Sequence, residues 1–148
     1  MLKIYPIAKL QTVSELLNST RHQILLTRSW ASQFPNTPGV YIFRHGESII
    51  NVGETGSIRG RMKDIIDTRN HTLRRSVGIK LYSDRIDFAK SSSKQRFCDA
   101  IEKQLNQYIV SNLTLSFLPV SLGRKELEER LFSVHTPEYN SKGLRITI

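Results

Sequence analysis

The chain has 148 residues, 39% of them hydrophobic and 24% charged, and this balance fits one folded domain rather than a disordered chain. Its net charge is +9, no apolar run approaches the roughly 20 residues of a membrane helix, and the N-terminus lacks the apolar core of a secretory signal. The single cysteine, Cys98, excludes an internal disulfide and a cysteine-based zinc site. We therefore expect a cytoplasmic protein with no membrane partner and with Cys98 in its core.

The positive charge is concentrated between residues 59 and 96, where eleven Lys or Arg residues stand against four Asp residues. Arginine outnumbers lysine in the whole chain, 13 to 9, and a guanidinium group suits bidentate contacts with phosphate. A concentrated basic region favours a polyanionic partner, most often a nucleic acid. A solvated surface that only keeps the protein soluble is the alternative.

The first third of the chain predicts a helix followed by a β-hairpin. Thr12 and Glu15 have the spacing of a capping box, which predicts a helix over 12–26 that ends before the breaker sequence at 34–38. Segments 39–44 and 48–53 are rich in β-branched and aromatic residues, as in paired strands.

The hairpin register follows from the alternation of apolar residues. A three-residue loop pairs Tyr41 with Asn51 and leaves an apolar face of Val40, Ile42, Ile50 and Val52. A two-residue loop pairs Val40 with Asn51 and mixes the two faces. The period of two favours the first register.

The rest of the chain predicts helices and a third strand. A helix begins near Ser57, a short helix lies within 71–81, and Ser93 caps a helix that buries Phe97, Ile101, Leu105 and Tyr108. A strand over 113–120 precedes a helix over 124–135, whose core face is Leu127, Leu131 and Val134. The predicted fold is α+β, with a small three-stranded antiparallel sheet flanked by helices. We divide the chain into a helical N-terminal extension, 1–37, packed on a core domain, 38–148.

Five short motifs follow one another between residues 38 and 140. The first two lie on the expected hairpin and read Gly39-Val40-Tyr41 and Asn51-Val52-Gly53. The others are 57–62, with Arg61, 127–132, with Glu128, and 137–140, which ends in Asn140. In this order and spacing they resemble the motifs of the GIY-YIG nucleases, with Asn51 where that family usually has a tyrosine.

The resemblance implies a divalent-metal-dependent endonuclease that cleaves DNA, in a compact stand-alone form of restriction or phage type. It assigns catalysis to Tyr41, which orients or deprotonates the attacking water, to Arg61, which contacts the scissile phosphate, and to Asn51 and Glu128. Glu128 would bind Mg²⁺ or Mn²⁺, and a carboxylate is the hard oxygen ligand that Mg²⁺ prefers. Structural roles within the motifs fall to Gly39, Gly53 and Asn140.

The basic region is then expected to hold the DNA backbone beside the active site. The residues assigned to this contact are Arg59, Lys63, Arg69, His71, Arg74, Arg75 and Lys80. One active site cuts one strand, so a double-strand break would require a homodimer or sequential nicking. Because an amide cannot ionise, Asn51 leaves an alternative open, namely a nucleic-acid-binding module with weakened or lost catalysis.

Overall fold

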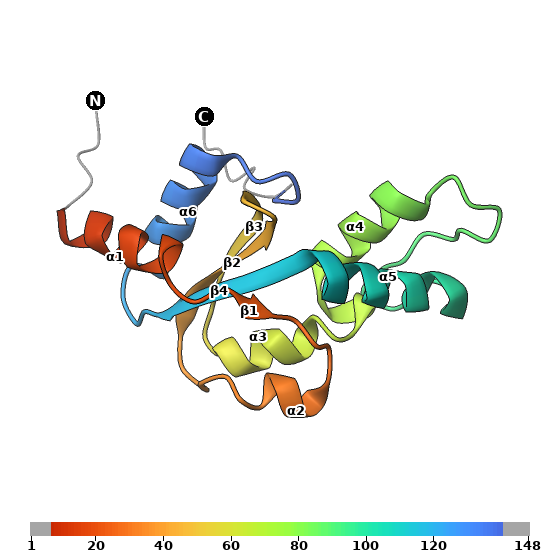
Figure 1. The fold of residues 1–148 in the computed structure, drawn as a ribbon, viewed down its shortest axis with the longest axis horizontal. Helices are drawn as coiled ribbons and strands as arrows, with labels where there is room; N and C mark the ends of the chain where they lie inside the picture. The colour runs from red at the N-terminus through yellow and green to blue at the C-terminus, as the bar shows by residue number, and fades with distance from the viewer. Residues whose placement is uncertain (1–6, 141–148) are drawn as a thin grey trace.

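The computed structural model describes residues 7–140, which form an α+β fold around one antiparallel sheet (Figure 1). The elements in chain order are α1 (Ile7–Leu17), β1 (His22–Gln23), α2 (Arg28–Ala31), β2 (Gly39–His45), β3 (Ser48–Thr55), α3 (Ile58–Asp64), the 3-10 helix η1 (Thr68–Asn70), α4 (Thr72–Tyr82), α5 (Asp99–Asn112), β4 (Leu113–Pro119) and α6 (Arg124–His135). The strand order is β1-β4-β2-β3. The predicted fold class is confirmed, although the sheet has four strands rather than three. Over residues 7–140 no helix is long and apolar enough to cross a membrane.

The N-terminal helix ends earlier than the sequence predicted. The expected helix over 12–26 is wrong at both ends, because α1 begins before Thr12, stops at Leu17, and is followed by His22, which pairs with Leu115 of β4. The side chains of Asn18 and Ser19 bond to the carbonyl groups of the last helical turn, which ends the helix there. Ile24, Trp30 and Phe34 belong to the same core cluster as the sheet. The division of the chain at residue 37 stays a prediction.

The hairpin register differs from both registers considered above. His45 pairs with Ser48 across a two-residue loop, in which Gly46 has a φ of 59°. A β-bulge then shifts the pairing, so that Tyr41 lies opposite Gly53 and Phe43 lies opposite Asn51. The extra residue restores the alternation that a two-residue loop alone would have broken. The expected pairing of Tyr41 with Asn51 is therefore wrong, although both residues are on one face.

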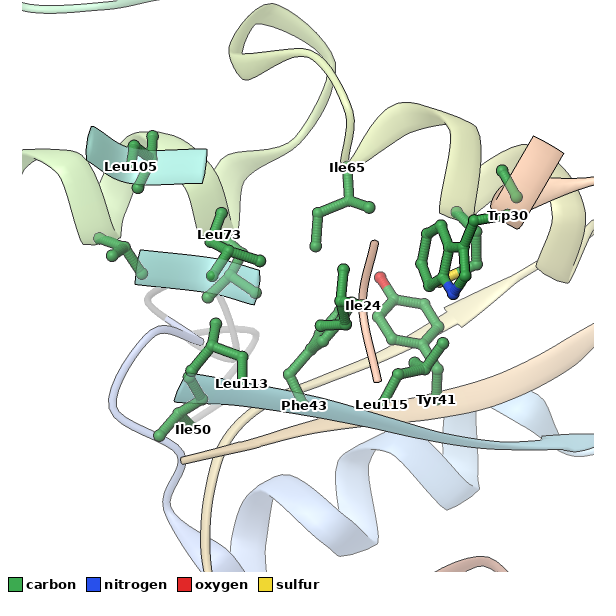
Figure 2. Packing of buried hydrophobic residues seen from close by; sticks show 14 of the residues in the cluster. Ile24, Trp30, Tyr41, Phe43, Ile50, Ile65, Leu73, Leu105, Leu113 and Leu115 are labelled. Carbon is green, nitrogen blue, oxygen red and sulfur yellow. The ribbon is translucent and has the colours of Figure 1, made fainter. Parts of the chain in front are cut away.

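The sheet is covered on both faces. Val40, Ile42 and Val52 pack against Leu16 of α1 and against the apolar side of α6. The opposite face packs against α2, α3, α4 and α5, and Figure 2 shows Tyr41, Phe43 and Leu115 of the sheet facing Ile65 and Leu73. Ile50, which was expected beside Val40, belongs to this second cluster because the bulge turns it over.

Three of the four helices expected after the hairpin are found with their predicted starts. Ser57 caps α3, His71 caps α4, and α6 has the predicted bounds of 124–135. By contrast, α5 begins at Asp99 rather than near Ser93, and it buries Ile101, Leu105 and Ile109.

Two side chains expected in the core are exposed. Cys98 precedes α5 and lies at the surface, with its thiol 3.6 Å from an Asp87 oxygen. Val134 of α6 is 55% exposed, while Leu127 and Leu131, with Phe132 beside them, pack against the sheet.

Candidate active site

Tyr41 is placed by the hairpin register. It lies directly opposite Gly53, and a Cβ atom at Gly53 would come within 2.2 Å of the tyrosine Cζ and Oη atoms. The phenol therefore rests against the bare backbone of β3, and only glycine leaves room for it there. Gly39 has a comparable role, since a Cβ atom would lie 2.6 Å from the Leu118 carbonyl oxygen and 2.7 Å from Cδ1 of Ile58.

Arg61 of α3 meets this phenol. Its Nε donates a hydrogen bond to the Tyr41 Oη at 3.0 Å. Its Nη1 donates to Asp64 Oδ2 at 3.2 Å and to the Asn70 carbonyl oxygen at 3.3 Å. The guanidinium is thus held from three directions, while a quarter of the side chain stays exposed.

Burial raises the pKa of Tyr41. The adjacent Arg61 cation opposes this rise, whereas the negative charges of Glu128 and Asp64 add to it. The phenol is therefore protonated at neutral pH. Because its oxygen already accepts from Arg61, its own O–H is left to act as a donor.

Glu128 reaches the same site from the other face of the sheet. Its neighbours Leu127 and Leu131 are buried against the sheet, which fixes α6 beside β3. The Glu128 Oε2 accepts a hydrogen bond from the Glu54 backbone N–H at 2.9 Å. Glu54 directly follows Gly53, against which the Tyr41 phenol rests, so the Glu128 carboxylate lies near the Tyr41–Arg61 contact. Its negative charge adds to the rise in the pKa of Tyr41.

Asn140 joins the segment after α6 to the outer edge of β3. Its Oδ1 accepts from the Val52 N–H at 2.7 Å, and its Nδ2 donates to the Val52 carbonyl oxygen at 2.8 Å. The adjacent Tyr139 N–H donates to the Ile50 carbonyl oxygen at 2.9 Å. The last motif therefore braces the strand that carries the second motif.

Asn51 is buried on the same face as Tyr41, opposite Phe43. Within residues 7–140, its Oδ1 and the Nε2 of His71 are buried without a protein hydrogen-bond partner. The His71 ring lies 5.8 Å from the Phe43 ring, centroid to centroid. Asn51 and His71 are thus both neighbours of Phe43.

His71 was expected to contact DNA, and its burial corrects this expectation. Its Nδ1 accepts the Leu73 N–H at 3.2 Å, so the neutral ring carries its proton on Nε2. Burial, together with the charges of Arg61, Arg74 and Arg75, holds its pKa well below the usual range. His71 caps α4 and is neither a phosphate ligand nor a general base in this arrangement.

Arg74 was also expected at the DNA surface, and it is completely buried. Its Nη2 donates to Glu102 Oε1 at 2.8 Å, its Nε to Thr68 Oγ1 at 3.0 Å, and its Nη1 to the Ile65 carbonyl oxygen at 3.2 Å. These contacts join α4, α5 and the end of α3. In this structure Arg74 stabilises the fold and cannot touch a phosphate.

The other expected DNA contacts are mostly engaged within the protein. Arg59 donates to the Phe34 carbonyl oxygen, and Arg75 donates to those of Thr68 and Arg69. Lys80 pairs with Glu138, and Arg69 pairs with Asp67, which also binds Arg96. Exposed Lys63 lines a groove of about 800 Å³ together with Arg28, Ile66, Arg96, Asp99 and Asn106.

Two residues that the sequence analysis did not single out belong to the site. Glu54 supplies the N–H that binds Glu128, and its carboxylate accepts from Arg124 Nε at 3.0 Å. Their signal in the sequence is position: Glu54 directly follows Gly53, and Arg124 lies one helical turn before Glu128.

Beside Gly53 and Glu54, a phenol, a guanidinium and a carboxylate supply a hydrogen-bond donor, a cation and a hard oxygen ligand, which are groups that phosphodiester cleavage can use. The model of the family described as the GIY-YIG catalytic domain matches residues 27–146, and the chain belongs to this family. The resemblance noted in the sequence is thereby confirmed.

The chain is also similar to individual proteins. The UvrABC system protein C of Natronomonas pharaonis is 33% identical over 67 residues, which are 45% of this chain and 11% of that protein. The N-terminal endonuclease domain of UvrC from Thermotoga maritima, described as bound to magnesium, its catalytic divalent cation, has 17% identity and a TM-score of 0.46. That comparison covers 76% of this chain and 93% of the other. A point mutant of the same domain has 17% identity and a TM-score of 0.44 over the same shares.

Proposed function

We propose that the chain is a divalent-metal-dependent endonuclease that hydrolyses phosphodiester bonds in DNA. The observation that carries the proposal is the contact of 3.0 Å between Arg61 Nε and Tyr41 Oη, beside the Glu128 carboxylate. Cleavage of a phosphodiester requires stabilisation of phosphate charge, a positioned water and help for the leaving oxygen. The net charge of +9 supports a polyanionic substrate.

Each residue has a role that its environment supports. Arg61 is partly exposed and can donate to the scissile phosphate with the N–H groups that Tyr41 and Asp64 leave available. Tyr41, whose phenol is protonated and whose oxygen already accepts from Arg61, donates a hydrogen bond through its O–H to the attacking water or to a phosphate oxygen and so orients it. The buried amide of Asn51 lies one residue pair along the same face and can hold water next to the phenol.

Glu128 fits a Mg²⁺ or Mn²⁺ ion through its hard oxygen donors. Among residues 7–140 no cluster of three or more His, Cys, Asp or Glu side chains surrounds a common point. This suits Mg²⁺, which keeps several waters and binds through one or two carboxylates and the substrate phosphate. When bound, the ion neutralises phosphate charge and lowers the pKa of bound water.

A restriction-type enzyme that recognises a sequence and cuts both strands as a homodimer is the finer form of this proposal. Its alternative is a nucleic-acid-binding module with weakened catalysis, which the amide at Asn51 favours because an amide cannot transfer a proton as a phenol can.

The test is incubation of the chain with supercoiled plasmid in Mg²⁺ or Mn²⁺, beside an EDTA control. Discrete fragments would support sequence-specific cleavage, a smear would indicate a general nuclease, and uncut but bound plasmid would support the binding module. We expect Glu128→Gln to abolish cleavage and to leave DNA binding intact, because the amide keeps the shape but loses the charge. Glu129→Gln, on the exposed neighbour, is the matched control and should cut at the wild-type rate.

A further inference from the structure

Glu54 contacts α6 twice, once through its backbone and once through its side chain. Its N–H donates to Glu128 Oε2 at 2.9 Å, and its own Oε2 accepts from Arg124 Nε at 3.0 Å. Arg124 and Glu128 are four residues apart in α6, so they lie on one face of the helix, one turn apart. One residue of β3 therefore holds both ends of the helical turn that carries Glu128.

Arg124 occupies a position that is unfavourable for an unpaired cation. It is the first residue of α6, where the helix dipole is positive, and Gly123 before it has a φ of 77° and no capping side chain. Its Nη1 also donates to the Ser121 carbonyl oxygen at 2.9 Å. The Arg124 guanidinium thus connects the first turn of α6, which has no side-chain cap, to Glu54 of β3 and to Ser121 in the loop before the helix.

The ion pair is shielded from solvent. The side chains of Arg124 and Glu54 are only 27% and 19% exposed. Partial burial strengthens the attraction between the charges and reduces its screening by salt. Leu127 and Leu131 hold the helix against the sheet independently, so the pair acts on the orientation of the first turn rather than on the existence of α6.

We propose that Glu54 and Arg124 are positioning residues that fix the orientation of the Glu128 carboxylate toward its metal ion. This inference rests on the proposed function, in which Glu128 binds the metal. Neither residue is assigned a contact with substrate. Groups that orient a metal ligand typically contribute 10- to 100-fold to metal affinity. Glu54→Gln and Arg124→Gln are each expected to raise the Kd for Mn²⁺ by about 10-fold.

In the experiment, the DNA-free chain is titrated with Mn²⁺. Binding is monitored through the paramagnetic broadening of the backbone amide NMR signals of residues 53–55 and 127–129. The variants are Glu54→Gln, Arg124→Gln and the charge exchange Glu54→Arg with Arg124→Glu. Lys125→Gln removes an exposed positive charge next to Arg124 and is the matched control, with an expected wild-type Kd. The charge exchange is expected to recover most of the affinity lost in either single variant.

The outcomes separate the two proposals. If Mn²⁺ broadens these signals equally in the wild type and in Glu128→Gln, the metal role of Glu128 is wrong. If the wild type binds and both single variants bind equally well, the positioning role is wrong. If Glu54→Gln and Arg124→Gln lower the melting temperature but leave the Kd for Mn²⁺ unchanged, the pair is only a structural contact and the inference is wrong. The inference is also wrong if the charge exchange does not recover the affinity for Mn²⁺.

Discussion

Replacing Arg74 by alanine should destabilise the fold rather than weaken a DNA contact. The guanidinium is completely buried and makes three hydrogen bonds, of which the one to Glu102 is an ion pair. Removing one partner of a buried pair costs about 3–5 kcal/mol, because the remaining charge is left without compensation. Glu102 keeps the Thr68 hydroxyl at 2.7 Å and the Phe97 N–H at 3.0 Å, so we expect the lower end of this range.

The free energy of unfolding of the wild type and of Arg74→Ala is measured by urea unfolding, with circular dichroism as the signal. A loss of about 3 kcal/mol is a large fraction of the 5–15 kcal/mol typical of a domain. For a chain of this size it corresponds to a melting temperature lower by roughly 6–12 °C. Arg75→Ala is the control, since Arg75 is only half-buried and donates to two backbone carbonyls; we expect a loss of about 1 kcal/mol.

Exchanging both members of the pair gives a sharper test. Arg74→Met with Glu102→Leu removes both charges together, and such exchanges are often neutral or stabilising. The double variant should therefore unfold at a higher urea concentration than Arg74→Ala. The reasoning would be refuted if Arg74→Ala unfolded like the wild type while its DNA affinity fell with a reduced salt dependence, which would make Arg74 a phosphate contact.

Three further predictions concern the site and its surroundings. Gly53→Ala should reduce cleavage at least as strongly as Tyr41→Phe in single-turnover assays, because the added Cβ displaces the phenol. Asn51→Ala should lower the single-turnover rate by roughly 10- to 100-fold, as for a polar contact of about 1–3 kcal/mol in the transition state, with the melting temperature nearly unchanged. Two arginines hold the pKa of Asp67 well below its usual range, so its contribution to stability is present above about pH 4 and is lost as the pH falls. Asp67→Asn should flatten that part of the stability profile in acid urea titrations.

Local patterns in the sequence were enough to predict much of the fold. The apolar spacing of Leu127 and Leu131 gave α6 its predicted bounds, and the cap at Ser57 placed α3. What the sequence could not supply was decided by tertiary contacts. The two-residue strand β1 is defined by its pairing with β4, and the bulge in the hairpin, which the alternation of apolar residues did not reveal, puts Ile50 on the face of Tyr41.

The candidate site, like the fold, could be predicted from the sequence only in part. Motif order was sufficient to select Tyr41, Arg61 and Glu128, which the structure brings together around Gly53 and Glu54 of β3. Charge counting selected Arg74 and His71 as surface contacts, but both face the core. A run of cationic residues does not reveal which of them pairs with a carboxylate on another helix. Only the packing of α4 on α5 supplies Glu102 to Arg74.

The outer edge of β3 links the stability of the sheet to the proposed chemistry. An edge strand presents unpaired N–H and C=O groups that could pair with another chain. Here Asn140 occupies both backbone groups of Val52, Tyr139 occupies the Ile50 carbonyl, and Glu128 occupies the Glu54 N–H. These contacts leave little of the edge for a second copy to extend the sheet, so a dimer that cuts both strands would have to form through another surface. The Glu54 N–H, which would otherwise be unpaired at this edge, therefore also orients the Glu128 carboxylate that we propose as the metal ligand.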